Sequence, residues 1–208
     1  MVGPAPVGGL VLAAGAASRY GPPKVLARLA GRTLLEHALD ALVQGGCDPV
    51  LAVLGANAEA IRRAVALPTT VFNPDWSTGM GSSLRAGLAA LPADLDAVVV
   101  ALADQPLVGA EVVRRLVRAV AAVPAGAGAA VATYAGRPRN PVLLTRPVFA
   151  EVAAAVHGDR GARDWLRAHP DRVVPVPCDD AGDPADVDTP ADLARLAGSV
   201  SSREELSP

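Results

Sequence analysis

The chain carries short, unbroken apolar runs that are separated by turn-forming residues. Apolar runs without polar alternation are typical of strands that are covered on both faces, as in a parallel sheet between helices. The run AVVVALA at 97–103 is the most apolar and is expected to lie deepest. The expected strands are 9–13, 49–54, 69–72, 97–103, 129–134 and 172–176.

Helical periodicity fills the intervals between these runs. In TLLEHALDALVQ, five apolar residues fall on one helical face, and two glycines follow. The expected helices are 33–44, 58–66, 82–91, 109–122, 147–155 and a last one that opens at Thr189. Strands that alternate with crossover helices predict an α/β fold, a three-layer Rossmann-like sandwich with a mostly parallel sheet. We expect one domain over residues 1–198 and a disordered polar tail at 199–208.

Composition narrows the class of protein. Hydrophobic residues make up 51% of the 208 but aromatics only 3%, so Ala, Val and Leu must build the core. The net charge of −2 provides no basic field for a nucleic acid. No apolar run approaches the roughly 18 residues that are needed to cross a bilayer. The first residues also lack the basic segment followed by an apolar segment that is typical of a signal peptide. We therefore expect a cytoplasmic protein that acts on neither nucleic acid nor membrane.

The loop LVLAAGAASRYGPPK at 10–24 follows the first strand, where open parallel sheets bind their ligands. It matches neither the Walker A pattern nor the GxGxxG fingerprint, which argues against a simple NAD-binding oxidoreductase. Gly15 leaves backbone amides open to an anion, and Arg19 and Lys24 add positive charge. The loop is either a triphosphate-binding site or an ordinary surface turn with solvated cations.

A second segment, NPDWSTGMGSSL, has two glycines around Met80 and two serines at a helix start. Ser82 or Ser83 is suited to cap the helix, and a cap is the simpler interpretation. The functional alternative is that Gly79, Ser82 and Ser83 bind the edge of a nucleobase.

Two acidic segments predict a metal site. Asp104 ends the most apolar strand, and a carboxylate there needs a cationic partner such as a divalent metal. In DVDTPADL, Thr189, Pro190 and Asp192 form a complete helix start. Asp186 and Asp188 share a face in extended chain, and either is a candidate second metal ligand. We favour Asp188.

The motifs LAAGAASRYGPPK, GMGSSL, ADQP, GDRGAR and DVDTPADL occur in this order and together resemble those of MobA-like nucleotidyltransferases. The resemblance is greatest to MocA-type molybdenum cofactor cytidylyltransferases and covers residues 7–197. It implies a nucleotide-diphospho-sugar transferase type of fold and Mg²⁺-dependent transfer of CMP from CTP with release of pyrophosphate. The implied catalytic residues are Arg19, Lys24 and Asp104, and the implied metal ligands are Asp104 and Asp188. The implied nucleotide-binding residues are Leu12, Ala13, Ala14, Gly15, Arg19, Lys24, Gly79, Ser82 and Ser83.

The acceptor side of the resemblance is less closely matched. Its polar candidates are Arg137, Asn140, Asp159 and Arg163. RNPV stands where MocA-type enzymes often have GHPV, so Asn140 replaces a histidine of the family. The resemblance therefore does not decide whether molybdopterin is the acceptor. Alternatives are the same chemistry with another NTP or phosphorylated acceptor, and a non-catalytic cofactor carrier or maturation partner for the apoprotein of a molybdenum hydroxylase.

Overall fold

The structure is a computed structural model and describes residues 6–16, 20 and 23–204. Within these residues, a seven-stranded sheet has the order β5-β4-β1-β6-β8-β7-β9. The strands are β1 (Val7–Ala13), β4 (Val50–Leu54), β5 (Thr69–Phe72), β6 (Ala97–Leu102), β7 (Ala129–Tyr134), β8 (Arg137–Thr145) and β9 (Val173–Pro177). A separate hairpin pairs β2 (Arg28–Leu29) with β3 (Arg32–Thr33). The four strands from β5 to β6 are parallel, as the unbroken apolar runs predicted.

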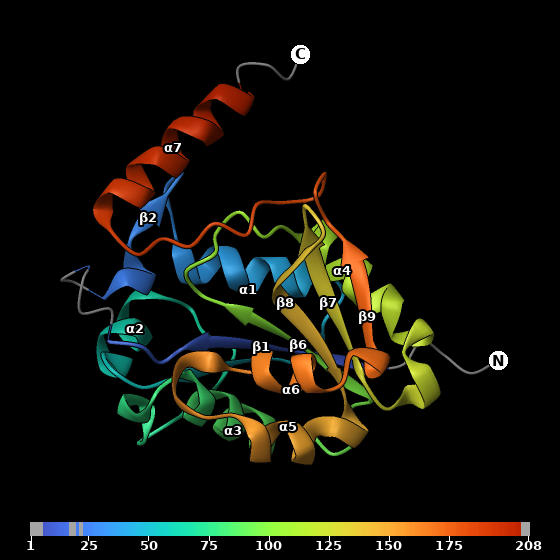
Figure 1. Cartoon of the computed structure of the whole chain (residues 1–208). Helices are drawn as coiled ribbons and strands as arrows, with labels where there is room; N and C mark the ends of the chain where they lie inside the picture. The colour runs from blue at the N-terminus through green and yellow to red at the C-terminus, as the bar shows by residue number, and fades with distance from the viewer. Residues whose placement is uncertain (1–5, 17–19, 21–22, 205–208) are drawn as a thin grey trace.

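Helices cover both faces of the sheet and form the three expected layers (Figure 1). One core cluster joins α1, α2 and α4 to one face, and a second joins α3, α5 and α6 to the other. The helices are α1 (Leu34–Gln44), α2 (Ala58–Ala64), α3 (Met80–Ala90), α4 (Ala110–Ala119), α5 (Phe149–Ala155), α6 (Arg163–Ala168) and α7 (Pro190–Glu204). No helix in the described part of the chain has the length and apolar character needed to cross a membrane.

Strand β8 was missed by the hydrophobic pattern. It runs antiparallel between β6 and β7, so the sheet is mixed. Its first three residues, RPR, are exposed and Asn140 is half-buried, and its pairing with β7 shifts register between Val131 and Ala132. The β7–β8 turn at Ala135 and Gly136 has positive φ at both residues, the geometry of a tight hairpin. Strand β8 is long enough to reach from the core to the edge where the site lies.

The chain from β9 to α7 crosses the carboxyl edge of the sheet before α7 leaves the body (Figure 1). Val187 is buried on this crossing with Leu29, Leu34 and Leu196 in a small third cluster. Thr189 and Asp192 form the helix start that DTPADL predicted: Asp192 N–H donates to Thr189 Oγ1, and Thr189 N–H donates to Asp192 Oδ2. Helix α7 continues to Glu204 and so enters the segment expected to be a disordered tail, while 205–208 lie outside the described residues.

Candidate active site

A lysine bridges two carboxylates at the carboxyl edge of the sheet. Lys24 Nζ donates to Asp104 Oδ2 at 2.8 Å and to Asp188 Oδ1 at 3.0 Å. Asp104 follows β6, Lys24 opens a 3-10 turn (Lys24–Leu26) after the β1 loop, and Asp188 precedes α7. Asp104 and Asp188 lie 80 and 164 positions after Lys24. Lys24 and Asp104 meet because the parallel strands β1 and β6 end at one edge, and the segment between β9 and α7 brings Asp188 to the same edge.

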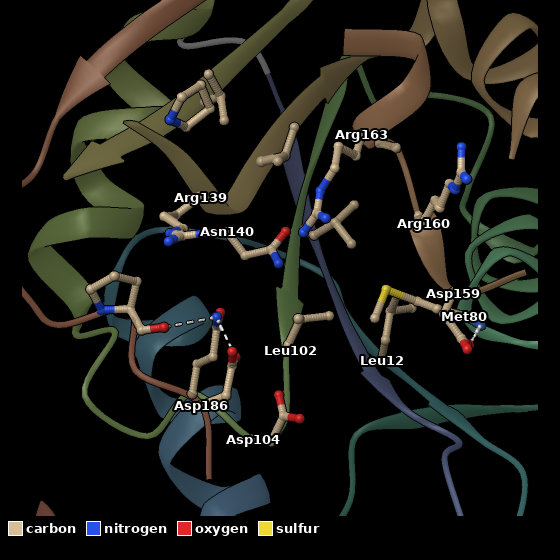
Figure 2. A pocket seen from close by; sticks show the side chains of 18 of the residues that line it. Leu12, Met80, Leu102, Asp104, Arg139, Asn140, Asp159, Arg160, Arg163 and Asp186 are labelled. Carbon is tan, nitrogen blue, oxygen red and sulfur yellow. Dashed lines mark hydrogen bonds between the residues drawn. The ribbon is translucent and has the colours of Figure 1, made fainter. Parts of the chain in front are cut away.

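Hydrogen bonds to the backbone and to Gln105 hold the acidic segment against the end of β6. Val187 N–H donates to the carbonyl of Asp104 at 2.9 Å. The buried Gln105 amide donates to Asp186 Oδ1 at 2.8 Å and to the Pro184 carbonyl at 3.1 Å (Figure 2). Asp186 is thus held by Gln105, whereas Asp188 reaches Lys24. This difference favours Asp188 over Asp186 as the partner of Asp104.

The charges of the site shift the pKa of two of its groups. Burial lowers the pKa of Lys24, but the charges and hydrogen bonds of Asp104 and Asp188 outweigh it and raise that pKa above its usual value. Lys24 therefore stays charged. Partial burial, with the nearby charges of Asp104 and Asp188, raises the pKa of Asp186. The cluster holds more negative charge than one lysine neutralises.

The donor set fits a hard divalent cation. Asp104 Oδ1 is buried and has no hydrogen-bond partner among the described residues, and Gln105 Oε1 is in the same state. Within the described part of the chain, no group of three or more His, Cys, Asp or Glu side chains forms a metal cluster. Two carboxylates suit Mg²⁺, which fills its remaining positions with water and phosphate oxygens. Asp104 and Asp188 would hold such an ion, and it would neutralise charge on a triphosphate.

One cavity, of about 540 Å³, extends from this cluster over the end of β1. The predicted nucleotide-binding residues Leu12, Ala13, Ala14, Gly15, Lys24, Gly79 and Ser83 all line it. A Cβ added to Gly15 would meet nothing within 4 Å, so the space beside that backbone is open. Trp76 also lines this cavity and was not among the candidates. Arg19 lies outside the described residues, so its expected role stays a prediction.

The serine segment is built differently from the expected cap. Gly79 is the N-cap of α3, and no side chain caps that helix. Ser82 does not line either cavity of the site: Asn73 Nδ2 donates to its hydroxyl at 2.8 Å, and that hydroxyl lies 2.8 Å from the Gly79 carbonyl. Asn73, buried and missed in the sequence, also donates to Ser83 Oγ at 3.0 Å. Ser82 therefore shapes the loop, and Ser83 remains the serine at the cavity.

Gly79 joins the two halves of the site. Its φ is 110°, and a Cβ there would lie 2.4 Å from the backbone of Gly158. Met80 N–H donates to Asp159 Oδ1 at 3.2 Å across the same contact. The GMGSS loop thus packs directly on the GDRGAR segment. This backbone contact explains why position 79 is a glycine.

A second cavity, of about 520 Å³, lies on the other side of the cluster. The two cavities share Leu12, Met80, Leu102, Asp104, Asp159 and Asp188, so they are contiguous. The acceptor-side candidates Asn140, Asp159 and Arg163 line the second cavity (Figure 2). Arg137 does not: it lies at the exposed start of β8, opposite Tyr134. Arg139 and Arg160 also line the cavity and were not among the candidates, although their neighbours Asn140 and Asp159 were.

One sequence signal for the site was available but unused. Lys24 is the only lysine in the sequence, although lysine and arginine together number 19. The ammonium of lysine is a compact charge that fits between two carboxylates, whereas the guanidinium of arginine is a wider, planar group. A lone lysine in an arginine-rich chain therefore marks a position that requires this geometry.

The fold and this divided cleft are those of a nucleotidyltransferase, and the chain belongs to the MobA-like NTP transferase family: the model of the MobA-like NTP transferase domain matches residues 9–173. The predicted family and fold class are thereby confirmed.

Among its relatives, the nicotine blue oxidoreductase of Paenarthrobacter nicotinovorans is 41% identical, over 91% of this chain and 96% of that protein. The bifunctional IPC transferase and DIPP synthase of Rubrobacter xylanophilus is 36% identical over 90% of this chain, which spans half of that protein. The crystal structure of Rv0371c from Mycobacterium tuberculosis H37Rv superposes with a TM-score of 0.81 at 32% identity, covering 95% of this chain and all of that one. Rv0371c has also been solved in complex with manganese (TM-score 0.79, 33% identity, 93% and 99% covered).

Proposed function

We propose that this protein transfers CMP from CTP to a phosphate-bearing acceptor and releases pyrophosphate, with Mg²⁺ as its metal. The observation that carries the proposal is the Lys24, Asp104 and Asp188 cluster at the junction of two contiguous cavities. Such a junction would let a triphosphate occupy one cavity and a nucleophile the other. The bound metal would neutralise charge on the triphosphate and on the departing pyrophosphate.

The residues of this chain supply alignment and charge. An oxygen of the acceptor phosphate attacks the α-phosphorus of CTP, and the bond from that phosphorus to the bridging oxygen of pyrophosphate breaks. A phosphate monoester is already anionic near pH 7, so no general base is required. Lys24, within reach of the junction, stabilises the charge that builds on the leaving pyrophosphate. Amides around Gly15 hold the nucleotide from the β1 side.

The preference for CTP is supported by the sequence pattern. The chain has LAAG followed by Pro23–Lys24, which looks like the cytidylyl branch, whereas the guanylyl branch usually has LAGG with Asp–Lys. The acceptor is most simply molybdopterin, and the apoprotein of a molybdenum hydroxylase would receive the finished cofactor. Asn140 in place of the family's histidine opens the same site to another phosphorylated acceptor.

The decisive experiment incubates the protein with each NTP, Mg²⁺ and candidate acceptors, and monitors pyrophosphate. We expect release with CTP in the presence of an acceptor and none after chelation of the metal. CTP binding without release of pyrophosphate in the presence of any of the acceptors would favour the non-catalytic maturation partner instead. Pyrophosphate release with GTP or ATP but not with CTP would refute the nucleotide preference, while the proposal of a nucleotidyl transfer would stand.

A second candidate is an oxidoreductase that uses the same cleft. It is favoured by one observation, the 41% identity to a protein named nicotine blue oxidoreductase. The dinucleotide fingerprint is absent, so a nicotinamide dinucleotide would have to occupy the cavities on either side of Asp104. Oxidation of NADH or NADPH with a quinonoid dye, inhibited by CTP, would support this candidate. Absence of dinucleotide binding in calorimetry would exclude it.

A further inference from the structure

Two arginines of the second cavity carry charge that no described carboxylate neutralises. Arg139 projects from β8 and Arg163 from the first turn of α6, and both line the cavity (Figure 2). Neither side chain has an ion pair or hydrogen bond among the described residues, unlike Arg115, which pairs with Asp180, and Arg172, which pairs with Glu151. An unpaired guanidinium on a surface is ordinary. Two that converge on one cavity from distant parts of the sequence need a further explanation.

The acidic residues near Arg163 are already engaged. Asp159 accepts the hydrogen bond of Met80 N–H, and Asp164 pairs with Arg160 at 3.3 Å. The local structure therefore leaves the charge of Arg163 available to a ligand. Asn140 lies on the same wall as Arg139 and adds a neutral amide donor and acceptor (Figure 2).

The rest of the cavity divides into an apolar floor and an acidic end. Leu12, Leu102 and Val142 belong to the floor, and no aromatic side chain is among the described lining residues. Asp104, Asp186 and Asp188 lie at the acidic end with Lys24, where the reacting phosphate must approach the α-phosphorus. In Figure 2, Arg163 and Asn140 lie on the opposite side of Leu102 from Asp104. The available positive charge is therefore displaced from the reacting centre.

We infer that Arg139, Asn140 and Arg163 form an anion subsite that binds a second anionic group of the acceptor, a carboxylate or a second phosphate. This inference rests on the proposed function and specifies its substrate class for the alternative in which the acceptor is a phosphorylated molecule other than molybdopterin. The acceptor carries one anion at the metal end and one at the arginine end, joined by a body that rests on an aliphatic floor. A cavity of about 520 Å³ accommodates such a molecule. Guanidinium groups match planar or tetrahedral oxyanions in paired hydrogen bonds.

The test uses two probes that differ in one anionic group: 3-phosphoglycerate, with a carboxylate, and glycerol 3-phosphate, with a hydroxyl. Each is titrated calorimetrically into protein saturated with Mg²⁺ and a non-hydrolysable CTP analogue. We expect 3-phosphoglycerate to bind roughly tenfold more tightly, the gain of one charge-assisted contact. Arg163→Gln and Arg139→Gln should each reduce that preference to less than about threefold. Arg167→Gln is the matched control, because Arg167 lies on α6, is exposed and does not line the cavity.

Equal affinities for the two probes, or a preference that survives in both arginine variants, would overturn the subsite. Binding of neither probe to protein that has bound the CTP analogue would also overturn it while leaving the nucleotide half intact. Failure of the CTP analogue to bind would instead count against the proposed function. The same titration without nucleotide then measures the preference of the subsite on its own.

Discussion

Removing the Lys24 ammonium should strengthen metal binding to the free protein and weaken CTP binding. Lys24 Nζ lies between Asp104 and Asp188, in the position that the proposed metal ion would take. A metal must therefore displace the ammonium before it reaches both carboxylates. Lys24→Met keeps the aliphatic stem but removes the competing charge, so the two affinities should change in opposite directions.

The size of the effect follows from the exposure of each pair. The Lys24 side chain is 12% exposed and that of Asp104 25%, so we assign this pair about 1–2 kcal/mol. Asp188 is 57% exposed, and solvent screening limits its share to about 0.5 kcal/mol. Together these values, about 1.5–2.5 kcal/mol, correspond to roughly tenfold to seventyfold tighter binding of the metal in Lys24→Met.

Electron paramagnetic resonance of free Mn²⁺ measures this affinity without catalysis, and calorimetry measures CTP binding on the same samples. Lys24→Arg is the control, because it retains the charge and should not show the gain. Unchanged or weaker Mn²⁺ binding in folded Lys24→Met would refute the competition. A gain in Mn²⁺ affinity with undiminished CTP affinity would leave the competition standing but remove Lys24 from the triphosphate site.

Three further changes test the catalytic end, the loop contact and a helix start. Asp104→Asn should lower metal-dependent pyrophosphate release by about 100-fold or more without unfolding the protein, and undiminished turnover would remove the metal assignment. Gly79→Ala should cost about 2 kcal/mol or more in urea unfolding, because φ is 110° and the new Cβ would meet Gly158; a loss under about 0.5 kcal/mol would contradict that contact. Hydrogen bonds from the Thr33 backbone and hydroxyl lower the pKa of Glu36, so its ionised form stabilises the fold above the usual glutamate pKa. Glu36→Gln should therefore cost about 0.5–1 kcal/mol at pH 7, with the difference closing as pH falls through the lowered pKa, and a pH-independent difference would show that ionisation is irrelevant there.

The parallel half of the sheet was predictable because its strands are buried on both faces. The runs before Asp104 and after Gly8 contain almost no polar residue, and their carboxyl ends had to meet at one edge. The helix start at Thr189 was also predictable from the sequence, since a capping box is local. The order of motifs then indicated the family.

The antiparallel half was harder to predict because its signals depend on tertiary contacts. The polar start of β8 is specified by pairing with β7 around a bulge, not by its own periodicity. Because β8 was not predicted, Arg139 was missed, and Arg137, which lies at the exposed start of β8, was assigned to the acceptor side. The roles of Asn73 and Gly79 likewise come from a buried hydrogen bond and a backbone contact that no local pattern contains.

The single lysine gives the protein a built-in spectroscopic probe. Isotopic labelling with lysine alone would produce one side-chain signal, from the Lys24 ammonium between Asp104 and Asp188. Its chemical shift and proton exchange rate would report directly whether that ammonium contacts carboxylates or phosphate. The order in which metal, nucleotide and acceptor arrive could then be followed in the unmodified protein by one resonance.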